Sequence, residues 1–150
     1  MLKRFIYLTL SILWMLLIYS FSAATADASS EDSMFITDYI IKFFFSDPSE
    51  EIISIIETII RKIAHFSEYA VLSVLLTLTL RSFGLNYKKA AFSVALSFLY
   101  ALSDEVHQSF VPGRACRAFD VFIDTLGSLA GYYFTYVLYL IFKRKSICDE

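Results

Sequence analysis

Long apolar segments limit what this chain can fold into. Four stretches, at about 5–24, 62–80, 90–108 and 119–142, are mostly apolar over a length that can cross a bilayer. A membrane-spanning helix needs about 20 mostly apolar residues. The sequence is 57% hydrophobic and 19% charged, whereas soluble domains average roughly 45–50% and about 25%. We therefore predict an all-α membrane protein with four transmembrane helices.

The first apolar segment, residues 5–24, has two interpretations. Lys3 and Arg4 precede it, and the Ala-Thr-Ala at 24–26 resembles a signal-peptidase cleavage site. The apolar stretch is longer than the roughly 7–15 residues usual in a signal peptide, which favours a retained transmembrane helix. Under both interpretations the residues that follow lie on the outer side of the membrane.

Residues 25–61 are predicted to form an extracytoplasmic loop with amphipathic helices. The small, polar and acidic residues 25–33 are typical of a linker. Residues 34–45 are too few to span, and their polar side chains recur at helical spacing among aromatics, which predicts a helix lying in the membrane interface. The next helix is predicted to begin with an N-cap, a first-turn proline and an acidic third residue: Asp47, Pro48 and Glu50.

The basic residues predict the orientation in the membrane. Of the 13 Lys and Arg, eight share one side under the four-helix topology: Lys3, Arg4, Arg81, Lys88, Lys89, Lys143, Arg144 and Lys145. The other side has Lys42, Arg61, Lys62, Arg114 and Arg117. Because cytoplasmic loops are enriched in Lys and Arg, we expect residues 1–4 and 143–150 to be cytoplasmic and 25–61 to face outward.

Three clusters of polar residues interrupt the apolar core, residues 62–142. The first shares one helix face: Lys62, His65, Glu68 and Tyr69. The second stands near the end of the third apolar stretch: Asp104, Glu105, His107, Gln108 and Arg114. The third consists of two carboxylates, one helical turn apart, at the start of the last apolar stretch: Asp120 and Asp124. Since all three lie at the outer ends of their helices, we predict one water-accessible pocket.

Several chemistries are open to such a pocket. Asp104 or Glu105 could act as a general acid or base, with His65 as its partner. His65 with Glu68, and Asp104 with His107, have the spacing of metal-ligand pairs, but such short spacings are common, so no cofactor is assigned.

Other properties of these residues point to binding or packing. Lys62, Arg114 and Arg117 could hold an anionic group such as a lipid phosphate. The same residues could instead form structural ion pairs that only fix the helix bundle. Gly127 and Gly131 form a small-xxx-small pair that lets two helices approach closely. Nucleic acid binding is not supported, because the basic residues are divided between both sides.

The polar clusters resemble the motifs of the VanZ-like family of bacterial membrane proteins. The first motif stands here as Lys62, His65, Phe66, Tyr69, Ala70 and Leu72, and the second as Asp104, Glu105, Gln108, Phe110, Pro112 and Arg114. The third stands as Asp120, Asp124 and Gly127. The resemblance covers about 62–131. Asp124 departs from the asparagine more common there, which adds a carboxylate to the site.

The resemblance implies a bacterial multi-pass membrane protein, in a family whose namesake gives low-level teicoplanin resistance and which has no agreed reaction. Our leading hypothesis is an outward pocket that binds a cell-envelope lipid or a glycopeptide antibiotic. Its alternatives are a membrane-embedded hydrolase or transferase acting on a lipid-linked envelope substrate, and a structural or partner-binding membrane subunit.

Overall fold

The computed structural model describes residues 1–44 and 48–148, without side-chain detail at 26–33, 35 and 145–148. Every regular element in these residues is a helix, which confirms the predicted all-α class. The helices in chain order are α1 (Leu2–Ser22), α2 (Ala26–Phe44), α3 (Glu50–Ser82), α4 (Tyr87–Ala90), α5 (Phe92–Gln108) and α6 (Ala118–Cys148).

Three helices in the described ranges are long and apolar enough to cross a membrane: α1, α3 and the Ala118–Arg144 part of α6. The fourth predicted span corresponds to α5, which is shorter at 17 residues. Many large apolar side chains of these helices are exposed. Exposed apolar helix surfaces of this kind suit contact with lipid chains, which are as apolar as leucine.

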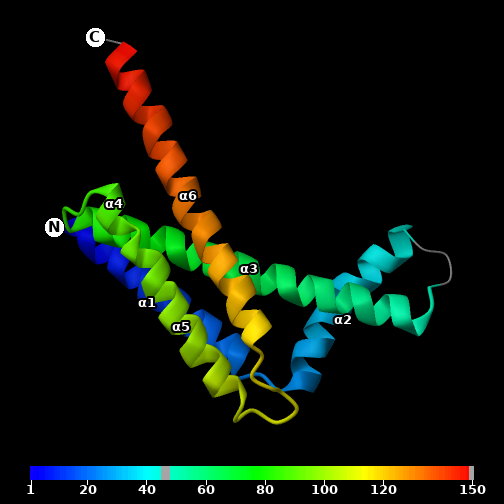
Figure 1. The fold of residues 1–150 in the computed structure, drawn as a ribbon. Helices are drawn as coiled ribbons and strands as arrows, with labels where there is room; N and C mark the ends of the chain where they lie inside the picture. The colour runs from blue at the N-terminus through cyan, green and yellow to red at the C-terminus, as the bar shows by residue number, and fades with distance from the viewer. Residues whose placement is uncertain (45–47, 149–150) are drawn as a thin grey trace.

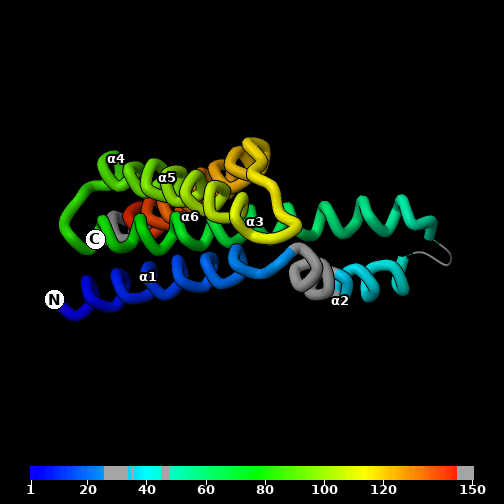
Figure 2. Tube along the Cα trace, turned by 90° about the horizontal axis from the view of Figure 1, so that it is seen from below, coloured from blue at the N-terminus to red at the C-terminus, as the bar shows by residue number. Residues whose placement is uncertain are grey.

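Helix α3 is the central element of the molecule and packs against α1, α2, α5 and α6 (Figure 1). α1 and α5 lie beside one half of α3, and α2 folds back beside the other half (Figures 1 and 2). With 33 residues, α3 is about 50 Å long, whereas the hydrocarbon core of a bilayer is about 30 Å thick. About 20 Å of the length of α3 therefore exceeds the thickness of the hydrocarbon core.

Close contact between α6 and α3 depends on two glycines. A Cβ atom at Gly127 would collide with the backbone carbonyl of Phe66, and one at Gly131 with that of Ala70. Glycine lets the two backbones approach where any side chain would hold them apart. The small-xxx-small pair of the sequence is thus confirmed as a helix-packing surface.

Hydrogen bonds and ring contacts fix α1 to its neighbours. The Trp14 indole Nε1 donates to the backbone oxygen of Glu68 at 2.9 Å. The Tyr100 hydroxyl donates to the Met15 carbonyl at 2.6 Å, and the hydroxyls of Ser11 and Thr79 lie 3.0 Å apart. α1 therefore makes specific polar contacts with both α3 and α5.

Two turns follow the sequence prediction. Gly84 ends the α3 region with a φ of +95°, and Gly113 follows Pro112 with a φ of +78°. Both angles lie in the left-handed region, which glycine adopts without the steric cost of a Cβ. The predicted breaks at 81–89 and after α5 are confirmed.

The prediction differs from the structure around α2 and the start of α3. Residues 26–33, predicted as a linker, belong to α2. Asp47, the predicted N-cap, lies outside the described residues. The cap is Ser49, whose hydroxyl accepts a hydrogen bond from the Ile52 amide at 3.5 Å, so Pro48 precedes the cap instead of following it. A serine hydroxyl serves this role as well as a carboxylate does.

Candidate functional site

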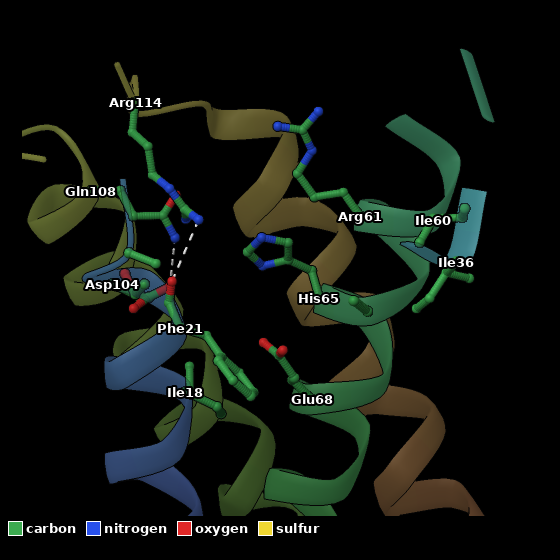
Figure 3. A pocket seen from close by; sticks show the side chains of 13 residues that line it. Ile18, Phe21, Ile36, Ile60, Arg61, His65, Glu68, Asp104, Gln108 and Arg114 are labelled. Carbon is green, nitrogen blue, oxygen red and sulfur yellow. Dashed lines mark hydrogen bonds between the residues drawn. The ribbon is translucent and has the colours of Figure 1, made fainter. Parts of the chain in front are cut away.

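A cavity of about 470 Å³ lies between α1, α2, α3 and α5, beside the loop that joins α5 to α6 (Figure 3). The apolar part of its lining consists of Ile18, Phe21, Ala24, Ile36, Ile60 and Ala64. The polar part consists of Ser22, Arg61, His65, Glu68, Asp104, Gln108 and Arg114. An apolar wall with a few convergent polar groups is the usual constitution of a small-molecule site.

Five residues predicted from the sequence line this cavity: His65, Glu68, Asp104, Gln108 and Arg114. They come from α3, α5 and the loop, and Figure 3 shows their side chains directed toward a common space. Gln108 Nε2 donates a hydrogen bond to Asp104 Oδ2 at 3.0 Å. The loop is fixed at the end of α1, where Arg114 Nη2 donates to the Phe21 carbonyl at 3.4 Å.

Helix geometry explains which residues of α3 reach the cavity. Successive residues on an α-helix are turned by about 100°, so positions three, four and seven apart share a face. Arg61, His65 and Glu68 satisfy this spacing and all line the cavity. Lys62 is turned away by one residue step and faces α6.

The sequence prediction did not include Arg61 in the site, nor the wall supplied by α1 and α2. The four-residue step from Arg61 to His65 could have placed Arg61 in the site, because residues four apart share a helix face. Ile18, Phe21 and Ile36 gave no signal, because an apolar residue in an apolar helix looks the same whether it faces lipid or a cavity.

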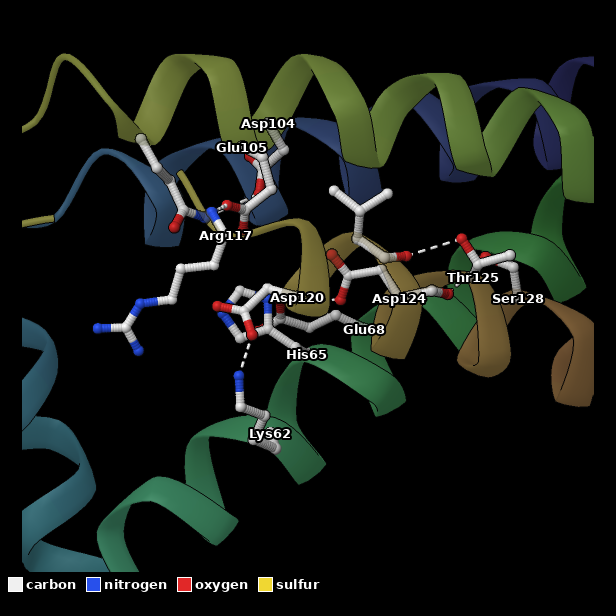
Figure 4. Close-up of polar contacts among 12 residues, drawn as sticks. Lys62, His65, Glu68, Asp104, Glu105, Arg117, Asp120, Asp124, Thr125 and Ser128 are labelled. Atoms are coloured by element: carbon white, nitrogen blue, oxygen red, sulfur yellow. Dashed lines mark hydrogen bonds and ion pairs between the residues drawn. The ribbon is translucent and has the colours of Figure 1, made fainter. Parts of the chain in front are cut away.

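A second polar cluster lies between α3, α5 and α6, outside the cavity lining (Figure 4). Lys62 Nζ forms an ion pair with Asp120 Oδ1. The Lys62 ammonium also lies 5.1 Å from the ring centroid of Phe119, within the range of a cation–π contact. Lys62 and Asp120 are thus brought together as a partnered pair that ties α6 to α3.

Asp124 is the most enclosed carboxylate of this cluster. Its side chain is fully buried, and neither carboxylate oxygen has a hydrogen-bond partner within the described chain. Asp124 Oδ1 lies 3.6 Å from Nδ1 of His65, close enough for an ion pair but beyond a hydrogen bond. His65 therefore belongs both to the cavity, which it lines, and to the second polar cluster, where it faces Asp124.

Glu105 holds the loop rather than lining the cavity. Its side chain is 1% exposed, and Oε2 accepts a hydrogen bond from the backbone amide of Arg117 at 2.7 Å. Asp104 and Glu105 diverge, as adjacent helical residues must. The Arg117 side chain is exposed and does not line the cavity.

Tyr69 and His107 also lie away from the cavity lining. Tyr69 is fully buried in the core, with its ring centroid 6.3 Å from that of Tyr100. The His107 ring lies 4.7 Å from the ring of Tyr19 on α1. Both contacts are packing contacts between helices.

Metal-ligand geometry is not found among residues 1–44 and 48–148, where no three His, Cys, Asp or Glu side chains surround a common point. The spacing that paired Asp104 with His107 fails because His107 is directed at Tyr19. His65 and Glu68 share a face, yet His65 Nδ1 is directed at Asp124.

The two guanidinium groups of the cavity face the same space. The pKa of the Arg114 side chain is lowered, first by its partial burial and then by the nearby positive charge of Arg61. Arginine stays charged through such a shift. The cavity therefore has two positive charges near the loop between α5 and α6.

Comparison with known families gives one result. The model of the VanZ/LLP1 family matches residues 6–143 of the chain. No curated protein and no solved structure matches it. The matched range contains every residue of the cavity and of the second cluster.

Proposed function

We propose, because the chain belongs to the VanZ/LLP1 family, that its cavity binds a cell-envelope lipid or a lipophilic glycopeptide antibiotic and thereby contributes to teicoplanin tolerance. One observation carries this proposal: a 470 Å³ cavity combines an apolar wall with charged side chains that have no ion-pair partner in the described residues. Small-molecule sites typically measure about 300–1,000 Å³ and use few polar groups to orient a ligand.

The proposal includes a topology with four spans and an outward cavity. α5 would be the third span, with Ala90 and Ala91 extending its apolar length next to Lys88 and Lys89. The excess of basic residues at that end, and in residues 1–4 and 143–150, supports a cytoplasmic location for both termini. The cavity lies at the other ends of α1 and α5, so it would face outward.

The test measures teicoplanin tolerance in a bacterial host that produces the protein. We expect Asp104→Asn and Arg114→Ala each to abolish the added tolerance while the protein still reaches the membrane. Arg117→Ala is the matched control, because its side chain is exposed outside the cavity and its backbone amide keeps the bond to Glu105. Unchanged tolerance in both cavity variants at equal protein levels would exclude this function.

A second candidate, a membrane-embedded hydrolase or transferase, is supported by the position of His65. A buried carboxylate beside a histidine that lines a cavity can orient the imidazole as a general base toward an attacking water. Asp124 would supply that carboxylate, and Asp104 would face the substrate. The test incubates the purified protein with envelope lipids in isotopically labelled water. Label entering lipid products with wild type but not with His65→Gln would support a hydrolase, and no incorporation would oppose it; transfer between two lipids, followed by mass spectrometry of the products, tests the transferase.

The third candidate is a structural or partner-binding subunit, in which the polar residues only hold the helices together. The Lys62–Asp120 pair already has that character. This reading requires that alanine at Arg61, Glu68 and Asp104 leave tolerance and lipid binding unchanged.

A further inference from the structure

The cavity holds both positive and negative charge. Figure 3 shows the Arg61 and Arg114 guanidinium groups at one end of the cavity and the Glu68 carboxyl group at the other, with Asp104 and His65 on opposite sides between them. Arg61 and Glu68 stand seven residues apart on α3, which corresponds to about 10 Å along the helix axis. The two residues therefore stand on different turns of α3.

Among the described residues, none of these four charged groups forms an ion pair with an opposite charge. The ion pairs among the described residues are Lys62 with Asp120 and His65 with Asp124. Arg114 donates to the neutral Phe21 carbonyl, and Asp104 accepts from the neutral Gln108 amide. Charged groups in partly buried sites are normally paired, because desolvation without a partner is costly.

Besides its positive and negative groups, the cavity has an apolar lining that a ligand must match. Figure 3 shows Ile18 and Phe21 of α1 on one side of the cavity and Ile36 of α2, next to Ile60, on the other. These side chains offer apolar surface to a hydrocarbon chain, since burying apolar area is favourable by roughly 25 cal/mol per Å². A purely polar solute would leave this lining without a partner.

We infer that the ligand of this cavity is an amphiphile whose headgroup carries both an anionic group and a protonated primary amine. The anionic group lies against Arg61 and Arg114, since guanidinium groups bind phosphate and carboxylate by paired hydrogen bonds. The ammonium lies against Glu68 and Asp104, and the hydrocarbon chain lies against the apolar side chains of α1 and α2. The inference rests on the proposed binding function and defines the chemical class that the cavity selects.

Phospholipids with different headgroups provide the test. The full-length protein is reconstituted in nanodiscs that contain equal amounts of phosphatidylethanolamine and phosphatidylglycerol, and the lipids that remain bound after release are counted by native mass spectrometry. Both lipids have the phosphate, but only phosphatidylethanolamine has the amine. We expect the wild-type protein to retain the amine lipid in preference by about tenfold, the usual effect of a hydrogen bond to a charged group.

Two carboxylate variants test whether Glu68 and Asp104 cause the preference for phosphatidylethanolamine. Glu68→Gln and Asp104→Asn should each reduce it severalfold while phosphatidylglycerol still binds. Glu51→Gln is the matched control, because Glu51 is an exposed carboxylate on α3, the helix of Glu68, and lies outside the cavity. Near-native helix content and an unchanged elution volume show that each variant is folded, and the two independent substitutions guard against a local defect in either.

The outcomes separate this inference from the binding function. Equal retention of both lipids by the wild-type protein, with loss of both in Arg114→Ala, overturns the amine requirement and leaves the binding function standing. Retention that is the same in wild type and Arg114→Ala overturns both. A phosphatidylcholine arm adds a further criterion: its quaternary amine donates no hydrogen bond, so retention equal to that of phosphatidylethanolamine would also overturn the inference.

Discussion

Nδ1 of His65 lies 3.6 Å from Oδ1 of Asp124, and this contact joins the cavity to the interface between α3 and α6. Asp124 is fully buried, so the imidazole is the ion-pair partner that the described residues offer to its carboxylate. A buried charge that loses its partner is strongly destabilising. The pair should therefore contribute to stability as well as to the site.

A double-mutant cycle measures that contribution. His65→Gln should destabilise the protein, and adding Asp124→Asn should restore part of the loss because the orphaned carboxylate is then removed. The expected coupling between the two positions is about 0.5–3 kcal/mol, from unfolding in detergent micelles. The control cycle combines His107→Gln with Asp124→Asn, since His107 packs on Tyr19 and forms no described contact with Asp124. Additive effects in both cycles would contradict the pairing.

The contact of α6 with α3 should not tolerate a methyl group at either glycine. Gly127→Ala places a Cβ against the Phe66 carbonyl, which is backbone and cannot rotate away. We expect a loss of about 1–3 kcal/mol in the free energy of unfolding. Ala130→Leu is the control, because Ala130 is exposed on the same helix. A stability for Gly127→Ala equal to that of the control would show that the helices lie farther apart than described.

Arg61 and Lys62 are adjacent in the chain but should have different effects when replaced. Arg61→Ala removes a cavity charge and should weaken retention of anionic lipid severalfold with little change in stability. Lys62→Ala leaves Asp120 without its partner, so it should lower the thermal midpoint while lipid retention stays near wild type. Native mass spectrometry and thermal unfolding of the two variants give both quantities. The reverse pattern would return Lys62 to the ligand-binding role expected from the sequence.

The N-cap of α3 should be Ser49. Ser49→Ala removes the acceptor for the Ile52 amide and should destabilise the first turn by about 1 kcal/mol. Hydrogen exchange at residues 50–53 should speed up by about fivefold, with no effect on lipid retention. Ser54→Ala, an exposed serine on the same helix, serves as the comparison. Equal exchange rates in the two variants would show that the cap lies elsewhere.

The sequence predicted features that depend on local spacing. The long apolar stretches predicted the helices, Gly84 and Gly113 predicted the turns, and Gly127 with Gly131 predicted a close helix contact. Each of these follows from the chemistry of one residue or one helix face, so no knowledge of neighbouring helices is needed.

The division of the polar residues into two groups could not be predicted in the same way. Lys62 and His65 are three residues apart and lie on nearly the same face of α3. The helices on either side of α3 decide which neighbour each side chain contacts. Lys62 meets Asp120 on α6, whereas His65 reaches both α6 and the cavity. Tertiary packing of α1 and α6 around α3 therefore turned one expected pocket into a cavity and a separate ion-pair cluster.

The elements around the cavity differ in how they are held in place. α1 is connected by hydrogen bonds to α3 and α5 through Trp14, Tyr100 and Ser11, and the loop is fixed by Arg114 and Glu105. α2 packs chiefly against α3. Among the side chains that the structure describes, hydrogen bonds join the α1, α5 and loop sides of the cavity to one another or to α3, whereas none joins α2 to them. A headgroup wider than the cavity would therefore enter by displacing α2.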